Sequence, residues 1–164
     1  MIRKIGLTVV SVVFLLPLIA SQLTENRDNM EQQQQQQQQQ IKELLEEKYI
    51  NAVANKLDTD KMLELFHPDF AIFSADGEEL KRFPLKEWKK AVDDYKQDNK
   101  GNPGLRTLTY DFASIDVTGN AAAAKVLLFR NEELIATDYI SLLKFNGVWK
   151  IVAKVPYAHV DKPF

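Results

Sequence analysis

The stretch "GNAAAAKVLLFRNEELIATDYISLLKFNGVWKIVAKVPYA", residues 119–158, alternates long apolar runs with short polar pairs. The pairs are Gly119-Asn120, Asn131-Glu132 and Asn146-Gly147, and Asn-Gly between apolar runs is a strong hairpin signal. A further run, "LRTLTYDFASIDV" at 105–117, precedes the first pair. This part of the chain therefore predicts four antiparallel strands joined by tight turns.

The turns also predict which residues face each other across the strands. If each turn is a two-residue loop, Ser114 lies opposite Lys125, Lys125 opposite Asp138, and Asp138 opposite Val155. Ser114, Lys125 and Asp138 then form a row on one face of the sheet. A bulge in any strand would move part of this row to the other face, because side chains alternate with a period of two.

The face that carries this row is the more aromatic of the two. Its other members are Tyr110, Phe112, Leu127, Phe129, Ile140, Leu142, Trp149, Ile151 and Tyr157. The opposite face carries Asp111, Val117, Val126, Tyr139, Ser141, Lys150, Val152 and Lys154. We expect helices to cover the aromatic face, so that Lys125 is buried and paired with Asp138, because either charge buried alone would be costly.

Three roles are open for the predicted pair of Lys125 and Asp138. It is an ion pair that only bridges two strands, or it orients a polar ligand in a cavity. The third role is catalysis, in which Asp138 acts as a base or Lys125 stabilises a developing anion.

The residues upstream of the strands predict helices. Apolar side chains recur at three- and four-residue spacing at Ile41, Leu44, Leu45, Tyr49, Ala52, Val53 and Leu57. A second, short helix follows, with Asp58 or Thr59 as its cap, Met62, Leu65 and Phe66 facing inward, and Pro68 as its stop.

A strand at residues 69–74 turns at Asp76-Gly77, and a third helix begins at Pro84. The third helix, 84–97, carries an apolar stripe of Leu85, Trp88, Val92 and Tyr95, and the loop 100–104 ends it. Helices first and an antiparallel sheet afterwards predict an α+β fold.

The N-terminus predicts export from the cytoplasm. Arg3 and Lys4 precede an apolar core and a small-residue exit at Ala20-Ser21, which is the layout of a secretory signal peptide. A membrane anchor is the rival interpretation, but the apolar run is short for a span and Pro17 interrupts it. We predict a signal peptide at 1–21, a polar linker with a glutamine tract at 22–40, and one domain at 41–164, working in the periplasm or secreted.

Composition excludes several classes of function. The chain has no cysteine, which rules out disulfides, thiolate metal sites and a cysteine nucleophile. A formal net charge of −2 without a basic cluster is a poor match for nucleic-acid binding. His67 and His159 lie far apart, so no metal site and no cofactor are predicted.

The runs "YINAV", "DTDKMLELFHPDFAIFSADGEEL", "SIDVTGNAAAAKV" and "TDYISLLKFNGVWKIVAKVPYAH" resemble the nuclear transport factor 2-like superfamily. The similarity spans about residues 41–160 and is greatest to secreted bacterial members grouped as "putative lumazine-binding" or SnoaL-like. It implies a cone: a strongly curved sheet around helices, with a cavity beneath them. It also implies homodimers through the convex face, while catalytic residues differ from branch to branch.

We therefore expect a small-molecule-binding protein with a pocket between sheet and helices. The candidate ligand-binding residues are Tyr49, Trp88, Tyr110, Phe112, Ser114, Lys125, Asp138 and Tyr157. One alternative is an isomerase-, dehydratase- or cyclase-type enzyme that uses Asp138, with His67 or a tyrosine as acid–base partner. The other is a non-catalytic dimeric interaction module with a closed core.

Overall fold

The computed structural model describes residues 15–98 and 107–161. The chain divides into two compact units, Met1–Gln36 and Gln37–Phe164. Most of the signal peptide predicted for residues 1–21, and the loop predicted for residues 100–104, lie outside the described residues. In the described part of the chain, no helix is both long enough and apolar enough to cross a membrane.

The segment predicted as a polar linker, 22–40, is helical and lies within helix α1 (Leu15–Leu44). Glutamine is a good helix former, so the tract can extend a helix that begins on either side of it. Within the second unit, the Gln38 side chain donates a hydrogen bond of 3.1 Å to the backbone oxygen of Ile115. That bond attaches the end of the tract to the sheet.

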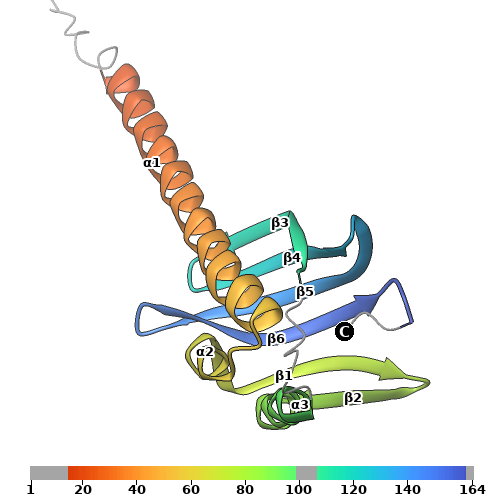
Figure 1. Ribbon diagram of the computed structural model, residues 1–164. Coiled ribbons are helices and arrows are strands. Elements are labelled where there is room, and N and C mark those ends of the chain that lie inside the picture. Colours follow the sequence, from red (N-terminus) through yellow and green to blue (C-terminus); the bar gives the residue numbers. More distant parts are fainter. Residues whose placement is uncertain (1–14, 99–106, 162–164) are drawn as a thin grey trace, which may run out of the picture. The chain divides into compact units, whose positions relative to one another are not determined.

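A six-stranded sheet and the helices that cover one of its faces form the second unit (Figure 1). After α1 the elements are η1 (Leu45–Asn55), α2 (Thr59–Leu65), β1 (Phe66–Asp76), β2 (Glu79–Pro84), α3 (Leu85–Asp98), β3 (Thr109–Thr118), β4 (Ala121–Arg130), β5 (Glu133–Phe145) and β6 (Val148–Ala158). The strand order is β2-β1-β6-β5-β4-β3, and only β1 and β6 run parallel. The predicted α+β fold is confirmed, although β2 was not predicted.

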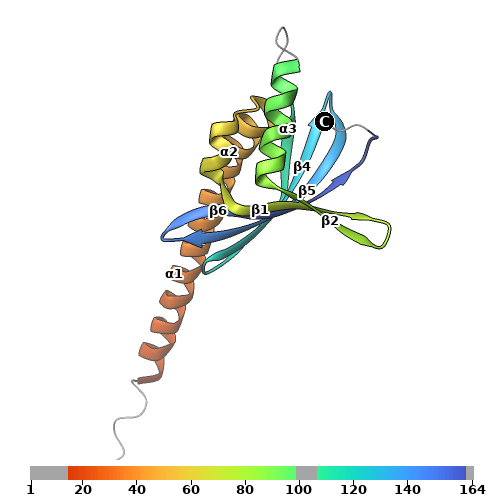
Figure 2. The same cartoon turned by 90° about the horizontal axis from the view of Figure 1, so that it is seen from below.

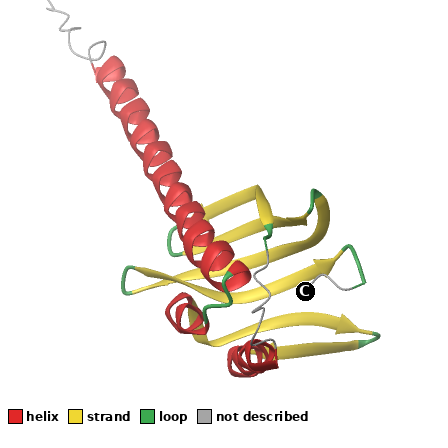
Figure 3. Ribbon diagram, in the orientation of Figure 1, coloured by secondary structure: helices red, strands yellow, loops and turns green. Residues whose placement is uncertain are grey.

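The sheet is open and curved, and helices α2 and α3 lie side by side on its concave face (Figure 2). We call this face, which η1 also covers, the inner face, and the other one the outer face. Short turns join β3 to β4, β4 to β5 and β5 to β6 (Figure 3). These are the three turns that the polar pairs predict.

The helix after α1 is a π-helix, in which backbone hydrogen bonds join residues five apart, as between Lys56 N–H and Asn51 O. Its wider turn keeps residues four apart on one face. Buried side chains accordingly recur at four-residue spacing in η1, at Leu45, Tyr49 and Val53, and the same spacing includes Ile41 in α1 and Leu57 after η1. Ile50, next to Tyr49, is fully buried as well.

The second helix forms as predicted, except that Phe66, predicted to lie in it, is the first residue of β1. The Asp58 carboxylate accepts hydrogen bonds from the backbone N–H groups of Asp60 and Lys61, which are otherwise unsatisfied at a helix start. The inward-facing residues Met62, Leu65 and Phe66 are all buried. The helix ends at Leu65, before the proline that prevents its continuation.

The first predicted hairpin register is confirmed from the turn as far as Ser114, which lies opposite Lys125. Phe112 pairs with Val126, so Ala113 is an extra residue in β3, and Phe112 does not share a face with Ser114 as predicted. The second predicted register is wrong. Next to the β4–β5 turn, Phe129 pairs with Leu134 but Leu128 pairs with Ala136, so Ile135 is an extra residue in β5. Beyond this bulge, Lys125 lies opposite Tyr139 instead of Asp138.

The third predicted register is wrong for the same reason. Leu142 pairs with Ile151 but Ser141 pairs with Ala153, so Val152 is an extra residue in β6. Asp138 consequently lies opposite Pro156 instead of Val155. The bulge also exchanges the two faces of β6 for every residue that follows it.

These bulges overturn the predicted burial of Lys125. Its ammonium lies 5.5 Å from the ring centroid of Tyr139, a side chain that is 50% exposed, so both residues are on the outer face. Ser114, directly opposite Lys125, is exposed too. Asp138 is buried as predicted, but it faces inward without Lys125.

The predicted division of the sheet into two faces is therefore partly correct. Ile140, Leu142, Trp149 and Ile151 are buried as expected. Tyr157, predicted on the same face, is 62% exposed. Three residues assigned to the opposite face are buried, namely Val117, Val126 and Lys154.

Candidate functional site

A buried cluster of three polar side chains lies between the inner face of the sheet and η1. Asp138 of β5 is fully buried, and Lys154 of β6 and Tyr49 of η1 are 5% and 2% exposed. The Tyr49 hydroxyl donates a short hydrogen bond to Asp138 Oδ2. Lys154 Nζ donates to the Tyr49 hydroxyl oxygen at 3.2 Å and lies 3.5 Å from Asp138 Oδ2.

Two irregular features of the backbone place these side chains together. The bulge at Val152 turns Lys154 to the inner face, diagonally across from Asp138. The four-residue spacing of buried positions in η1 points Tyr49 at the same part of the sheet. Neither charge is left unpaired in the interior, which is the condition for burying them.

Burial, the negative charge of Asp138 and the hydrogen bond to it together raise the pKa of Tyr49 well above its ordinary value. The phenol therefore keeps its proton at neutral pH and acts as a donor to the carboxylate. Within the described part of the chain, the other carboxylate oxygen, Asp138 Oδ1, is buried and has no hydrogen-bond partner. The cluster is thus a polar group inside an apolar core that is not fully satisfied by the protein.

Beside the cluster is a cavity of about 370 Å³. Its lining residues come from η1, the link between η1 and α2, β1, β2, α3, β4 and β6: Tyr49, Val53, Ala54, Leu57, Ile72, Phe83, Trp88, Ala91, Val92, Tyr95, Leu128, Lys154 and Pro156. Phe83 of β2 and Tyr95 of α3 are the large lining side chains with more than a third of their surface exposed. Parts of the cavity wall formed by β2 and α3 are therefore exposed to solvent.

Lys154 carries the one formal charge among these described lining residues. Its ammonium lies 5.0 Å from the ring centroid of Trp88 and 5.6 Å from that of Tyr49, within the range of a cation–π interaction. Asp138 is not one of the lining residues. The positive end of the buried cluster thus forms the cavity wall, and the negative end lies behind it.

The structure brings only part of the predicted ligand-binding set to the cavity. Tyr49 and Trp88 line it, and Asp138 contributes through Tyr49 and Lys154. Tyr110 and Phe112 contact each other, at 5.5 Å between ring centroids, and pack against the core away from the cavity lining.

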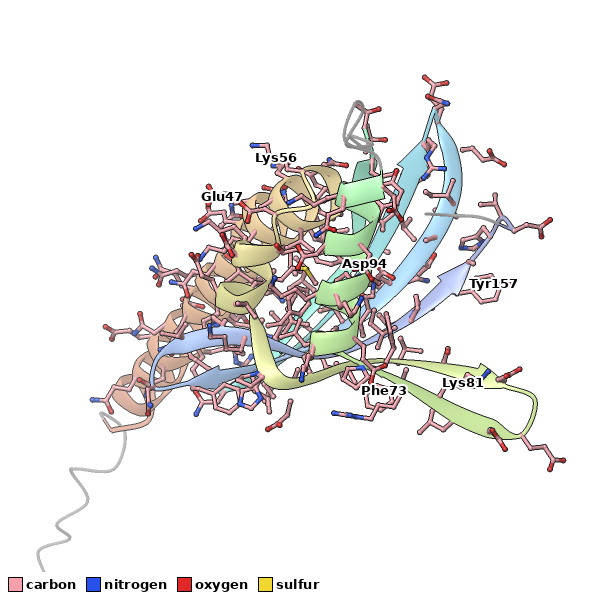
Figure 4. All side chains as sticks on the ribbon, turned by 60° about the horizontal axis from the view of Figure 1, so that its bottom comes forward. Glu47, Lys56, Phe73, Lys81, Asp94 and Tyr157 are labelled. Carbon is pink, nitrogen blue, oxygen red and sulfur yellow. The ribbon has the colours of Figure 1, made fainter. Side chains whose placement is uncertain are left out.

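The remaining candidates lie elsewhere on the fold. Ser114 and Lys125 are on the outer face of the sheet. Tyr157 is near the end of β6, away from α3, and contacts the ring of His159 (Figure 4). His67, the suggested acid–base partner, stacks on Phe145 at 4.7 Å and does not line the cavity.

Sequence reasoning missed Lys154 as the partner of Asp138. The signal for it is the same as for Lys125: a single lysine inside an apolar strand, here "IVAKVP" at 151–156. With two such lysines, the sequence alone does not identify the buried one. Among the described residues, no group of three or more metal-ligating side chains is present.

Comparison with known proteins agrees with this architecture. A family described as "Putative lumazine-binding" matches residues 35–157, about three quarters of the chain. No curated protein sequence matches.

Similar solved structures include NTF2-like proteins of unknown function from Shewanella baltica and Methylobacillus flagellatus. The Shewanella protein is 26% identical, with a TM-score of 0.60 over 77% of this chain and 96% of that one. The Methylobacillus protein is 30% identical, with a TM-score of 0.54 over 73% of this chain and 90% of that one. The chain therefore belongs to the "Putative lumazine-binding" family of the nuclear transport factor 2-like superfamily.

Proposed function

We propose that this protein binds a small, mainly apolar organic molecule in the cavity between the sheet and α3. The observation that carries the proposal is the cavity itself, about 370 Å³ of chiefly apolar wall with one polar corner. Cavities of this size and composition are typical binding sites for small molecules.

Two groups among the lining residues have chemistry suited to recognising a ligand. Aromatic side chains, Trp88, Phe83 and Tyr95, provide large and rigid contact area for a flat molecule. Tyr49 and Lys154 provide the polar groups that fix its orientation. The family description names lumazine, so lumazine is the first compound to test.

The geometry supports binding better than the predicted acid–base enzyme. Asp138, the proposed base, lies behind Tyr49 and Lys154, and His67 is stacked on Phe145. A general base must come within hydrogen-bond distance of the proton that it removes. The described lining residues include neither a carboxylate nor an imidazole.

Mass spectrometry of small molecules released from protein purified without denaturation tests the binding function. We expect one compound in stoichiometric amount. We also expect that compound, or lumazine, to change the fluorescence of Trp88 when it is added back to the protein. Stoichiometric ligand that stays bound when bulky residues fill the cavity, as in Ala54→Phe and Ala91→Phe, would show that the cavity is not the site.

We further propose that the protein works outside the cytoplasm, on the basis of the N-terminal basic, apolar and small-residue segments. Sequencing the N-terminus of protein from its host tests this, and an intact Met1 would contradict cleavage. The homodimer that the superfamily resemblance implies stays a prediction. Exposed apolar residues on the outer face, such as Tyr139, Leu143 and Val155, are its expected contacts, and analytical ultracentrifugation is the check.

A further inference from the structure

We propose that the molecule bound in the cavity carries an anionic oxygen group, such as a carboxylate, and that this group binds the Lys154 ammonium. This inference rests on the proposed binding function and adds the chemical class of the ligand. It follows from the hydrogen bonds and charges of the buried cluster.

Lys154 has donor capacity that the described residues do not use. An ammonium group has three N–H donors. One donates to the Tyr49 hydroxyl at 3.2 Å, whereas the 3.5 Å separation from Asp138 Oδ2 is too long for a good N–H···O hydrogen bond. Because Lys154 lines the cavity and is 5% exposed, its remaining donors are available to a ligand but hardly to bulk solvent.

The Asp138 carboxylate does not fully neutralise the positive charge of Lys154, so Lys154 can still attract an anionic ligand. Asp138 Oδ2 already accepts a hydrogen bond from the Tyr49 hydroxyl, which stabilises part of the negative charge. The carboxylate also lies behind the cavity wall, so a ligand in the cavity meets the ammonium first. The described lining is otherwise uncharged, and in such surroundings a positive charge attracts an anion more strongly than it does in water.

Trp88 indicates where the body of the ligand lies. Its ring is 5.0 Å from the Lys154 ammonium and lines the same cavity, so a ligand with its acid at Lys154 has its carbon skeleton beside the indole. A planar ring with a short acidic arm fits both contacts. This arrangement makes naphthylacetic acid a suitable test compound.

The test compares naphthylacetic acid with naphthylacetamide, which has the same ring and the same carbonyl but no charge at neutral pH. Binding of each to the mature protein is measured by calorimetry and by Trp88 fluorescence. We expect the acid to bind about tenfold more tightly than the amide or better, since hydrogen bonds to charged groups are the strong ones. In Lys154→Met we expect this preference to disappear.

Two further variants make the result interpretable. Lys154→Met leaves the buried Asp138 without its cation, so the double variant Lys154→Met with Asp138→Asn removes that charge while Tyr49 keeps an acceptor. The matched control is Lys125→Met, which removes a lysine from the outer face of the same sheet. The control should keep the preference for the acid, and the double variant should lose it.

The outcomes separate this inference from the proposed function. Equal binding of acid and amide to the wild-type protein, or an acid preference that survives in the double variant, would refute the proposal that Lys154 binds an anionic group of the ligand. Neither result would contradict binding in the cavity. Failure of both naphthyl compounds and lumazine to bind, with no compound released from native protein, would refute the binding function itself. Tight binding of the acid that Lys125→Met abolishes would place the site on the outer face.

Discussion

Replacing Lys154 by methionine tests the central structural finding, which is that Lys154 and not Lys125 is the buried partner of Asp138. Methionine has a similar length and no charge, so the change removes the ammonium but leaves most of the packing. Asp138 then stays in the core with the Tyr49 hydroxyl as its one hydrogen-bond donor among the described residues. The variant thus exposes the cost of burying an unpaired carboxylate.

The structure allows the size of this cost to be worked out. Two unit charges 3.5 Å apart attract each other by about 5 kcal/mol at an effective dielectric constant of about 20. Breaking a buried pair by removing one partner costs roughly 3–5 kcal/mol in proteins. Since Asp138 is fully buried and Lys154 is 5% exposed, we expect a loss of free energy of unfolding of about that size.

Urea unfolding at neutral pH measures the effect. With a denaturant dependence of about 2 kcal/mol per molar urea, the midpoint should fall by roughly 2 M. Lys125→Met, the control on the outer face, should change stability by no more than about 0.5 kcal/mol. If the two variants lose similar amounts, or if Lys125→Met loses more, the bulged register and the assignment of the pair are wrong.

The other predictions concern Tyr49, Trp88 and the cap of α2. Because its folded pKa is raised above the ordinary 10.0, Tyr49 contributes fully to stability below pH 10, and this contribution is lost as the unfolded chain ionises at higher pH. Tyr49→Phe should therefore cost about 1–3 kcal/mol at neutral pH, and its gap to the wild type in urea unfolding should narrow above pH 10; a constant gap would contradict the raised pKa. Trp88→Phe should abolish a ligand-induced fluorescence change, and Trp149→Phe, which alters a residue outside the cavity lining, should preserve it; the reverse result would place the ligand elsewhere. Asp58→Ala should lower the free energy of unfolding by about 1 kcal/mol, because two backbone N–H groups lose their acceptor, and an unchanged melting temperature would mean that water replaces the cap.

Much of the fold follows from local sequence signals. The polar pairs at the three turns, the cap at Asp58 and the stop at Pro68 act within a few residues, so they can be recognised without tertiary contacts. The strand β2 was missed because "ELKRFP" at 79–84 has no apolar face, and its pairing with β1 along one sheet edge is what makes it a strand.

The candidate site depended on information that is not local. The burial of Asp138 is predicted because the register counted from the turns puts it on the more aromatic face, and a buried carboxylate needs a partner. Its partner was assigned by counting residues from the turns, and that count fails once Ile135 and Val152 are inserted as bulges. Neither residue differs in type from its neighbours, so no sequence signal marks the bulges.

The sequence by itself determined that this protein has an α+β fold, three hairpin turns and a charged group buried in its sheet. The tertiary structure decided which charges meet. Each bulge moves every following side chain to the other face, because alternation along a strand has a period of two. Asp138 is buried on the inner face, where the wide turns of η1 place Tyr49, and Lys154 turns inward to pair with both. Lys125 has an equally apolar sequence around it but lies on the outer face beside Tyr139.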